Sequence, residues 1–273
     1  MTFSPADLLK QTARGAATAG AILSLFLSGC GRKQAAQGSG ANAAKSATPG
    51  ALSVDPSSVG TISGIVRFEG QRPKPAVIQM DQDPYCVARH NGPVFAEDDA
   101  VNPDGSLPNA FVYVKSGAEQ YAFPTPSQPV TLDQQGCIYR PHVLGLMVGQ
   151  TLRIVSSDTT THNIHAVTRA NREWNESQLP GSAAIDKVFT QAEVMIPIRC
   201  NQHPWMKAYV GVVRTPFFAV TGNDGAYTLR GLPPGSYTME AWAARFGTQQ
   251  QDVTVTPHSS ATLDFSLKSG GAS

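Results

Sequence analysis

The sequence predicts an all-β protein built as two β-sandwiches. From residue 60 onward, short runs rich in β-branched and aromatic residues recur between clusters of Gly, Pro, Asn and Asp, as in strands joined by turns. The chain has 25 Gly and 20 Pro in 273 residues, and beyond its N-terminal segment no stretch of ten or more residues shows a clear helical period. This length is sufficient for two small domains.

The N-terminal segment has the three-part layout of a secretory signal. Lys10 and Arg14 precede an uncharged run at residues 16–27, which is too short to cross a bilayer as a helix. Residues 27–30 (LSGC) resemble the bacterial lipobox. The resemblance implies a signal peptide at residues 1–29, a lipidated Cys30, and anchoring to a bacterial membrane on the periplasmic side or at the cell surface. The alternative is an ordinary signal peptide with a chance cysteine.

The segment after Cys30 predicts a flexible tether. Residues 30–59 are poor in bulky apolar groups and rich in Gly, Ala and Ser, so they cannot bury enough surface to fold. Residues 269–273 are expected to form a short tail. The formal net charge is +1 and no block of Lys and Arg occurs, which excludes nucleic acid as a partner.

The C-terminal part has the turn pattern of a further sandwich. Tight turns are indicated at residues 221–225 (TGNDG) and 232–235 (LPPG), with alternating hydrophobicity between them. Residues 216–268 resemble the carboxypeptidase regulatory-like (transthyretin-like) β-sandwich, whose opening x-G-x-V strand matches residues 63–66 (SGIV). The resemblance implies one Ig/transthyretin-like sandwich from residues 60–127 and 216–268, interrupted by residues 128–215. The alternatives are two domains in series, or residues 60–127 as N-terminal strands of the interrupting unit.

Four side chains able to bind a metal occur in the order His162, Cys200, His203 and Met206, the last three with the spacing C-x2-H-x2-M. The sequences on both sides of residues 200–206 are typical of strands, so this loop presents its donors at one end of a sandwich. One thiolate, two imidazoles and a weak thioether form the donor set of a blue copper site. Zinc is the alternative metal, although Met is a poor zinc ligand.

Residues 128–215 resemble the cupredoxins, particularly amicyanin and plastocyanin. The matching segments are residues 140–142 (RPH), 148–154 (VGQTLRI), 157–163 (SDTTTHN) and 200–206 (CNQHPWM). The resemblance implies a Greek-key sandwich that binds one copper ion per chain, as Cu(I) or Cu(II). It implies metal binding by His162, Cys200 and His203, an axial Met206, a loop-locking Asn163, and a His203 ring that reaches the surface. The irregular segment between His162 and Cys200 departs from the family.

The cysteine count is consistent with this assignment. If Cys30 carries lipid and Cys200 binds copper, Cys86 and Cys137 remain, and disulfides persist outside the cytoplasm. A Cys86–Cys137 disulfide is therefore predicted. The alternative, in which either residue pairs with Cys200, would exclude the copper site.

These features predict a membrane-tethered type 1 copper protein that carries single electrons to or from a redox partner protein. The alternative is a non-redox binding, adhesion or copper-handling lipoprotein. A copper enzyme such as a nitrite reductase needs a second metal with its own His ligands. The remaining histidines lack ligand spacing, and neither a Ser-His-Asp motif nor a phosphate-binding loop is evident, so an enzyme is not expected.

The sequence also predicts the positions of several other side chains. His165 should face away from the metal on its strand, and His142 should lie at the surface or be bonded within a loop. Residues 168–184 predict a long connection with room for one helical turn. A core position is expected for the aromatic residues Trp174, Trp242, Phe217 and Phe218.

Overall fold

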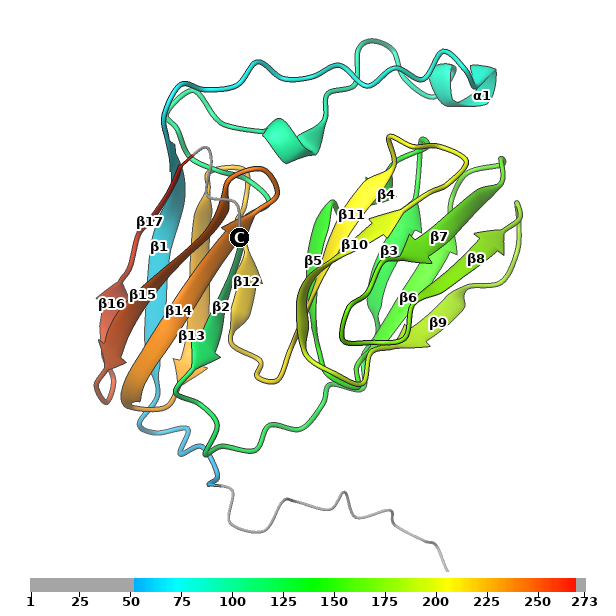
Figure 1. Cartoon of the computed structure of the whole chain (residues 1–273). Coiled ribbons are helices and arrows are strands. Elements are labelled where there is room, and N and C mark those ends of the chain that lie inside the picture. Colours follow the sequence, from blue (N-terminus) through cyan, green and yellow to red (C-terminus); the bar gives the residue numbers. More distant parts are fainter. Residues whose placement is uncertain (1–51, 269–273) are drawn as a thin grey trace, which may run out of the picture. The chain divides into compact units, whose positions relative to one another are not determined.

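The computed structural model describes residues 52–268 as a nearly all-β protein (Figure 1). In this part of the chain, helical structure is confined to α1 (Pro84–Val87) and the 3-10 turn η1 (Glu97–Asp99), both of which lie between the first two strands. The predicted all-β class is confirmed.

The first two and the last six strands form one β-sandwich, which we call the flanking sandwich. One sheet has the order β13-β1-β16, with β17 also paired to β1, and the other has the order β12-β2-β14-β15. β1 is antiparallel to β13 and parallel to β16 and β17. The strands are β1 (Gly60–Glu69), β2 (Phe111–Ser116), β12 (Phe218–Val220), β13 (Ala226–Leu232), β14 (Gly235–Ala243), β15 (Gly247–Val255), β16 (Ser260–Thr262) and β17 (Phe265–Lys268).

The strands between β2 and β12 form a second β-sandwich, which we call the central sandwich. Its sheets have the orders β5-β11-β10-β7-β8 and β4-β3-β6-β9. The strands are β3 (Val130–Gln134), β4 (Tyr139–Arg140), β5 (Val143–Met147), β6 (Thr151–Ser156), β7 (His162–Ala166), β8 (Trp174–Gln178), β9 (Ile185–Val188), β10 (Glu193–Arg199) and β11 (Lys207–Val213).

Each sandwich encloses its own apolar core, as expected for two sheets packed face to face. In the flanking sandwich the core includes Ile62, Val112 and Met239, and in the central sandwich it includes Leu132, Ile154, Ile164 and Val210. A smaller cluster contains side chains of both sandwiches, namely Phe111, Tyr113, Val143, Met195 and Val213.

Two sequence motifs of the flanking sandwich have clear physical causes. A Cβ on Gly64 would overlap the carbonyl oxygen of Leu263, so the SGIV strand needs glycine where the segment before β17 crosses it. The hydroxyl of Tyr237 donates to the carbonyl of Pro233 at 2.5 Å, which ties the LPPG turn to the start of β14. Tyr237 is buried, and this hydrogen bond satisfies its only polar group.

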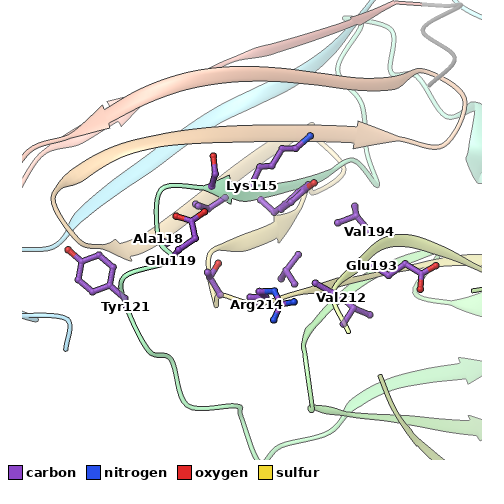
Figure 2. Close-up of a pocket in the computed structure, with 14 residues that line it drawn as sticks. Lys115, Ala118, Glu119, Tyr121, Glu193, Val194, Val212 and Arg214 are labelled. Atoms are coloured by element: carbon purple, nitrogen blue, oxygen red, sulfur yellow. The ribbon is translucent and has the colours of Figure 1, made fainter. Parts of the chain in front are cut away.

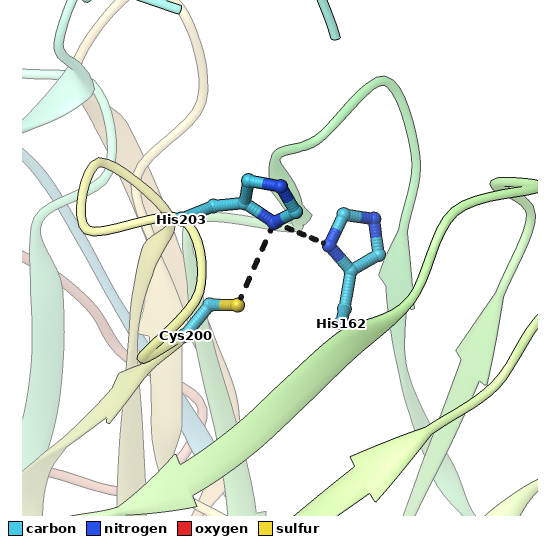
Figure 3. A group of neighbouring side chains, drawn as sticks. All are labelled: His162, Cys200 and His203. Atoms are coloured by element: carbon cyan, nitrogen blue, oxygen red, sulfur yellow. Dashed lines mark hydrogen bonds between the residues drawn. The ribbon is translucent and has the colours of Figure 1, made fainter. Parts of the chain in front are cut away.

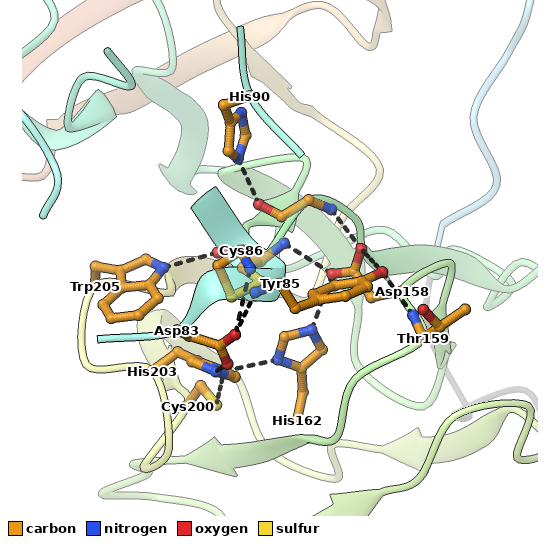
Figure 4. The surroundings of a disulfide bond; sticks show 12 residues. Asp83, Tyr85, Cys86, His90, Asp158, Thr159, His162, Cys200, His203 and Trp205 are labelled. Atoms are coloured by element: carbon orange, nitrogen blue, oxygen red, sulfur yellow. Dashed lines mark hydrogen bonds and ion pairs between the residues drawn. A yellow bond between two sulfur atoms is a disulfide. The ribbon is translucent and has the colours of Figure 1, made fainter. Parts of the chain in front are cut away.

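Residues 70–110 join β1 to β2, and we call them the β1–β2 connection. Asp83 caps α1 by accepting hydrogen bonds from the backbone N–H groups of Tyr85 and Cys86. Cys86 forms a disulfide with Cys137, which lies between β3 and β4. The predicted disulfide pair is thus present in the structure, and it fastens a connection of the flanking sandwich to the central one (Figure 4).

The structure differs from the sequence expectations in two segments. Residues 168–184 contain β8 rather than a helical turn, because residues 174–178 pair antiparallel with β7. The end of the expected tether is held in place, since the N–H of Leu52 donates to the carbonyl of Gln120 and that of Ser58 to the carbonyl of Asp55.

Other expectations remain predictions. The signal peptide, Cys30, residues 30–51 and the tail at 269–273 lie outside the described residues. Strands on both sides of residues 128–215 pair with each other, while the proposed domain boundaries themselves stay predictions. No helix within residues 52–268 has the length and hydropathy needed to span a membrane.

Candidate metal centre

The loop between β10 and β11 carries three of the four predicted ligands. These strands pair antiparallel as far as Arg199 and Lys207, so residues 200–206 connect them directly. The N–H of Cys200 donates to the carbonyl of Met206 at 3.3 Å, and the N–H of Met206 donates to that of His203 at 2.9 Å. These hydrogen bonds fold the loop so that the side chains of Cys200 and His203 approach each other (Figure 3).

His162 is the first residue of β7, and its imidazole meets this loop (Figure 3). Its Nδ1 lies 2.9 Å from Nδ1 of His203, and Sγ of Cys200 lies 3.8 Å from the same His203 nitrogen. One donor atom of each residue lies within 4.8 Å of the others. Their relative exposures are 0%, 2% and 5% for His162, Cys200 and His203. The structure therefore brings three predicted ligands to one buried point.

Asn163 links β7 to the ligand loop. Its side-chain oxygen accepts hydrogen bonds from the backbone N–H groups of Asn201, at 2.6 Å, and Gln202, at 3.3 Å. Its own N–H donates to Sγ of Cys200 at 3.5 Å. These contacts are the ones that a loop-locking residue would make.

Met206, the fourth predicted ligand, ends the loop immediately before β11. It is fully buried and belongs to the same apolar cluster as Cys200. Its axial role stays a prediction.

Each imidazole contacts a carboxylate with its second nitrogen. Nε2 of His162 lies 2.9 Å from Asp158 Oδ2, and Nε2 of His203 lies 2.9 Å from Asp83 Oδ2. Because an ionised carboxylate only accepts hydrogen bonds, each Nε2 carries a proton. The two Nδ1 lone pairs would then oppose each other at 2.9 Å unless a cation joins them. These residues therefore fit a bound proton or metal ion.

The same surroundings shift two pKa values. Burial disfavours the charged form of His162, but the hydrogen bond to Asp158 and the neighbouring Cys200 outweigh it and raise the pKa to about 9. Burial also disfavours the Cys200 thiolate, but hydrogen bonds from His162 and from the N–H of Asn163 lower the thiol pKa to about 7. The thiolate, which is the metal-binding form of cysteine, is thus readily formed at neutral pH.

The β1–β2 connection covers this centre (Figure 4). Asp83 reaches His203, while the hydroxyl of Tyr85 donates to Asp158 at 3.3 Å and accepts from the N–H of Thr159 at 2.7 Å. The expectation that His203 reaches the surface is wrong, because this connection buries the ring.

Sequence reasoning did not identify the two carboxylates. Asp158 lies four residues before His162 within the SDTTTHN segment, so its proximity could have been noticed. Asp83 is separated from His203 by 120 residues, and no local pattern links them.

The other histidines lie outside the cluster. His165 contacts Glu173 at 2.5 Å and Asn201 at 3.4 Å, in agreement with a side chain that faces away from the metal residues. His142 is buried rather than at the surface, because Asp98 lies 2.9 Å from its Nε2 and the carbonyl of Lys207 lies 3.1 Å from its Nδ1.

The aromatic residues expected in the core are only partly enclosed. Phe217 is buried, whereas Phe218, Trp174 and Trp242 are half-buried. Trp205 lies beside the centre, with its ring centroid 5.1 Å from that of His203 and its Nε1 donating to the carbonyl of Cys137 at 3.0 Å.

A pocket of about 390 Å³ lies elsewhere, between β2 and the strands β10 and β11 (Figure 2). Its lining includes Lys115, Glu119, Tyr121, Glu193 and Arg214, but none of the metal residues. Glu193 is already bonded to the backbone N–H groups of Arg169 and Ala170. The pocket therefore adds nothing to the candidate centre.

Two further groupings of His, Cys and carboxylates occur within residues 52–268. One contains Asp83, Cys86 and His203, and the other contains Cys137, Asp158 and His162. Both reuse an imidazole of the first centre, and both include a cysteine of the disulfide. The described residues therefore offer one candidate metal centre rather than three.

Comparisons with solved structures give partial likenesses to copper proteins. A Cu-containing nitrite reductase from Thermus scotoductus is 22% identical, with a TM-score of 0.31. The match covers 34% of this chain and 24% of the nitrite reductase chain. An amicyanin variant in the Cu(I) form is 23% identical, with a TM-score of 0.27. The match covers 31% of this chain and 81% of the amicyanin chain. A purple cupredoxin from Nitrosopumilus maritimus is 22% identical, with a TM-score of 0.27. The match covers 30% of this chain and 98% of the cupredoxin chain. At these TM-scores the likenesses carry no argument about the site.

Comparison at the sequence level gives one family. None of the curated proteins compared with the chain matches it. The model of the carboxypeptidase regulatory-like domain matches residues 201–268, beginning before the expected boundary at 216 and including β11 of the central sandwich. The chain thus carries a carboxypeptidase regulatory-like domain in its C-terminal part.

Proposed function

We propose that the protein binds one copper ion per chain at His162, Cys200, His203 and Met206 and carries single electrons. The observation that supports this most directly is the meeting of one thiol and two imidazoles, all nearly inaccessible to solvent, at one end of the central sandwich. Bound copper would supply a one-electron couple between Cu(I) and Cu(II).

The chain's own residues prepare this centre. Asn163 fixes the loop that carries Cys200 and His203, and the strand pairs β7–β10 and β10–β11 hold the loop to His162. Such a frame would keep the donor atoms in similar positions around Cu(I) and around Cu(II). The low pKa of Cys200 supplies the thiolate without a strong base.

The donor chemistry favours copper over zinc. Structural zinc sites use four N, S or O donors, whereas the fourth predicted donor is the thioether of Met206, in an apolar cluster. Two imidazoles, a thiolate and a thioether are the set that selects copper.

The location of the protein rests on the sequence alone. The apolar N-terminal run and residues 27–30 (LSGC) support lipidation of Cys30 and anchoring on the outer side of a bacterial membrane. On that side of the membrane, the redox partner would be another protein that docks on the folded part of the anchored chain. A Cys30→Ala protein should leave the membrane fraction, and its retention after high-salt washing would contradict the anchor.

The copper proposal is tested by an absorption spectrum of the protein loaded with Cu(II). An intense band near the red end of the visible, from thiolate-to-copper charge transfer, is expected with one copper per chain. A stoichiometric complex without that band would contradict a type 1 site. The Cys200→Ser protein, which keeps the Cys86–Cys137 disulfide, controls for copper bound at other sites and should lack the band.

A further inference from the structure

Two carboxylates from distant parts of the chain are hydrogen-bonded to the two imidazoles of the candidate centre. Asp158 precedes β7 in the central sandwich, whereas Asp83 belongs to the β1–β2 connection. Each lies 2.9 Å from Nε2 of its histidine. The side chain of Asp158 is 3% exposed, so water competes little for its hydrogen bond, whereas that of Asp83 is 26% exposed and is partly open to water.

This arrangement fixes which nitrogen of each ring is protonated. A neutral imidazole has one N–H and one lone pair, and the hydrogen bond made by one nitrogen decides the state of the other. A carboxylate at Nε2 holds the proton there, so the lone pair of Nδ1 points to the space shared by His162, His203 and Cys200. Without the carboxylates either tautomer would be allowed.

Asp83 is itself held by two independent restraints. Its Oδ1 caps α1 by accepting from the N–H groups of Tyr85 at 2.9 Å and Cys86 at 3.3 Å, which leaves Oδ2 for His203. The Cys86–Cys137 disulfide fastens α1 beside the ligand loop, where Trp205 donates to the carbonyl of Cys137. A residue of the flanking sandwich's connection is thus built into the centre of the central sandwich (Figure 4).

We propose that Asp83 and Asp158 are positioning residues that hold His203 and His162 as Nε2–H tautomers, and that the β1–β2 connection thereby completes the metal site. This inference rests on the proposed copper function for its metal-binding consequences, but not for the tautomers. Carboxylates bonded to ligand histidines increase their basicity and orient the ring. Two anionic partners also favour Cu(II) over Cu(I), so they lower the reduction potential.

Substitution of Asp83 by asparagine gives a sharp test. Asparagine retains one oxygen for the cap of α1, and its amide nitrogen then faces Nε2 of His203 as a donor. Nε2 must become an acceptor, which moves the ring proton to Nδ1. Asp158→Asn should have the corresponding effect on His162.

The first experiment follows the ring nitrogens of the metal-free protein by long-range ¹H–¹⁵N NMR at about pH 10, where His162, whose pKa is raised to about 9, is mostly neutral and has a defined tautomer. We expect Nε2–H at both His162 and His203 in the unsubstituted protein, loss of that proton only at His203 in Asp83→Asn, and only at His162 in Asp158→Asn. Asp98→Asn is the matched control, because Asp98 contacts Nε2 of His142 at the same 2.9 Å outside the centre. A His203 ring that keeps Nε2–H in Asp83→Asn would overturn the proposal, whether or not the protein binds copper.

The second experiment measures copper. Competition with a chelator should show a loss of Cu(II) affinity of roughly 10–100-fold in Asp83→Asn, as is usual for such partners of ligand histidines, and a higher reduction potential. Asp98→Asn should match the unsubstituted protein in both. A blue band in all proteins, with equal affinity and potential, would leave the proposed function intact and refute the role of Asp83. Absence of copper binding by the unsubstituted protein would refute the function, while the NMR result still decides the tautomers. If Asp158→Asn fails to fold, Asp83→Asn alone carries both measurements.

Discussion

The structure contains a buried His–Asp pair outside the candidate metal centre, and this pair differs from the His–Asp pairs of the centre in what the second ring nitrogen faces. His142 and Asp98 are as close as His203 and Asp83, with 2.9 Å between Nε2 and the carboxylate in both. The difference lies at Nδ1: in His142 it faces the carbonyl of Lys207, whereas in His203 it faces another imidazole and a thiol. A buried His–Asp pair is therefore structural when a protein acceptor takes the second nitrogen, and becomes a candidate ligand when none does.

The largest effect that would sharpen this comparison is expected from Cys200→Ser. The thiolate is the charge-transfer donor and the strongest ligand of the set, so the intense visible band should disappear completely. The measurement is an absorption spectrum after addition of Cu(II), with circular dichroism to verify the fold. A Cys200→Ser protein that stays blue would show that the metal sits elsewhere.

Removal of the disulfide should have the next largest effect. Cys86 and Cys137 are 51 residues apart, and the chain-entropy model gives about 4 kcal/mol for closing such a loop. The Cys86→Ala, Cys137→Ala protein should therefore unfold at lower urea concentration and bind Cu(II) more weakly, because Asp83 loses its restraint. The His142–Asp98 pair should keep its NMR signals. An unchanged urea midpoint would contradict this expectation.

Met206→Leu should change the centre more subtly. A long axial thioether contributes little affinity but stabilises Cu(II), so its removal should retain copper and the blue band while raising the reduction potential. Voltammetry of the two proteins measures the shift. Loss of copper from the leucine variant, or an unchanged potential, would show that Met206 is not an axial ligand.

Asp98→Asn should leave the copper centre unaffected but lower stability by about 1.5–3 kcal/mol at neutral pH, as for a hydrogen bond to a charged group. Burial would raise the pKa of Asp98, but the hydrogen bond and charge of His142 and the charge of Lys207 lower it below the ordinary value. A carboxyl group with a lowered pKa stabilises the fold fully above its unfolded pKa of about 3.9, and this contribution is lost as pH falls through the folded pKa. Urea unfolding at several pH values should therefore show the two proteins converging in acid. A constant difference at every pH would contradict this explanation.

The sequence was sufficient to predict features that depend on short segments. The all-β class follows from repeated strand and turn patterns, and the meeting of Cys200 with His203 follows from the length of one loop between two strands. The pair Cys86 and Cys137 followed from counting cysteines, and the structure contains that disulfide.

The hydrogen bonds between the β1–β2 connection and the histidines were not predicted. The contact between Asp83 and His203 exists only because the β1–β2 connection crosses to the other sandwich, so the burial of His203 was missed. His142 was expected at the surface or bonded within a loop, and its partner Asp98, which also belongs to that connection, was not identified. A single sequence contains the side chains of such contacts but not the path that brings them together.

The pairing of β1 determines when the protein can finish folding. β1 is made before every other strand, yet Ile62 pairs with Leu229 and Ala261, near the other end of the chain. The strands of the central sandwich pair with partners much nearer in sequence, so that sandwich can assemble before β1 is paired. A chain that stops after Val213 would therefore possess the whole ligand loop and still expose β1 as an unpaired edge, which is a template for aggregation.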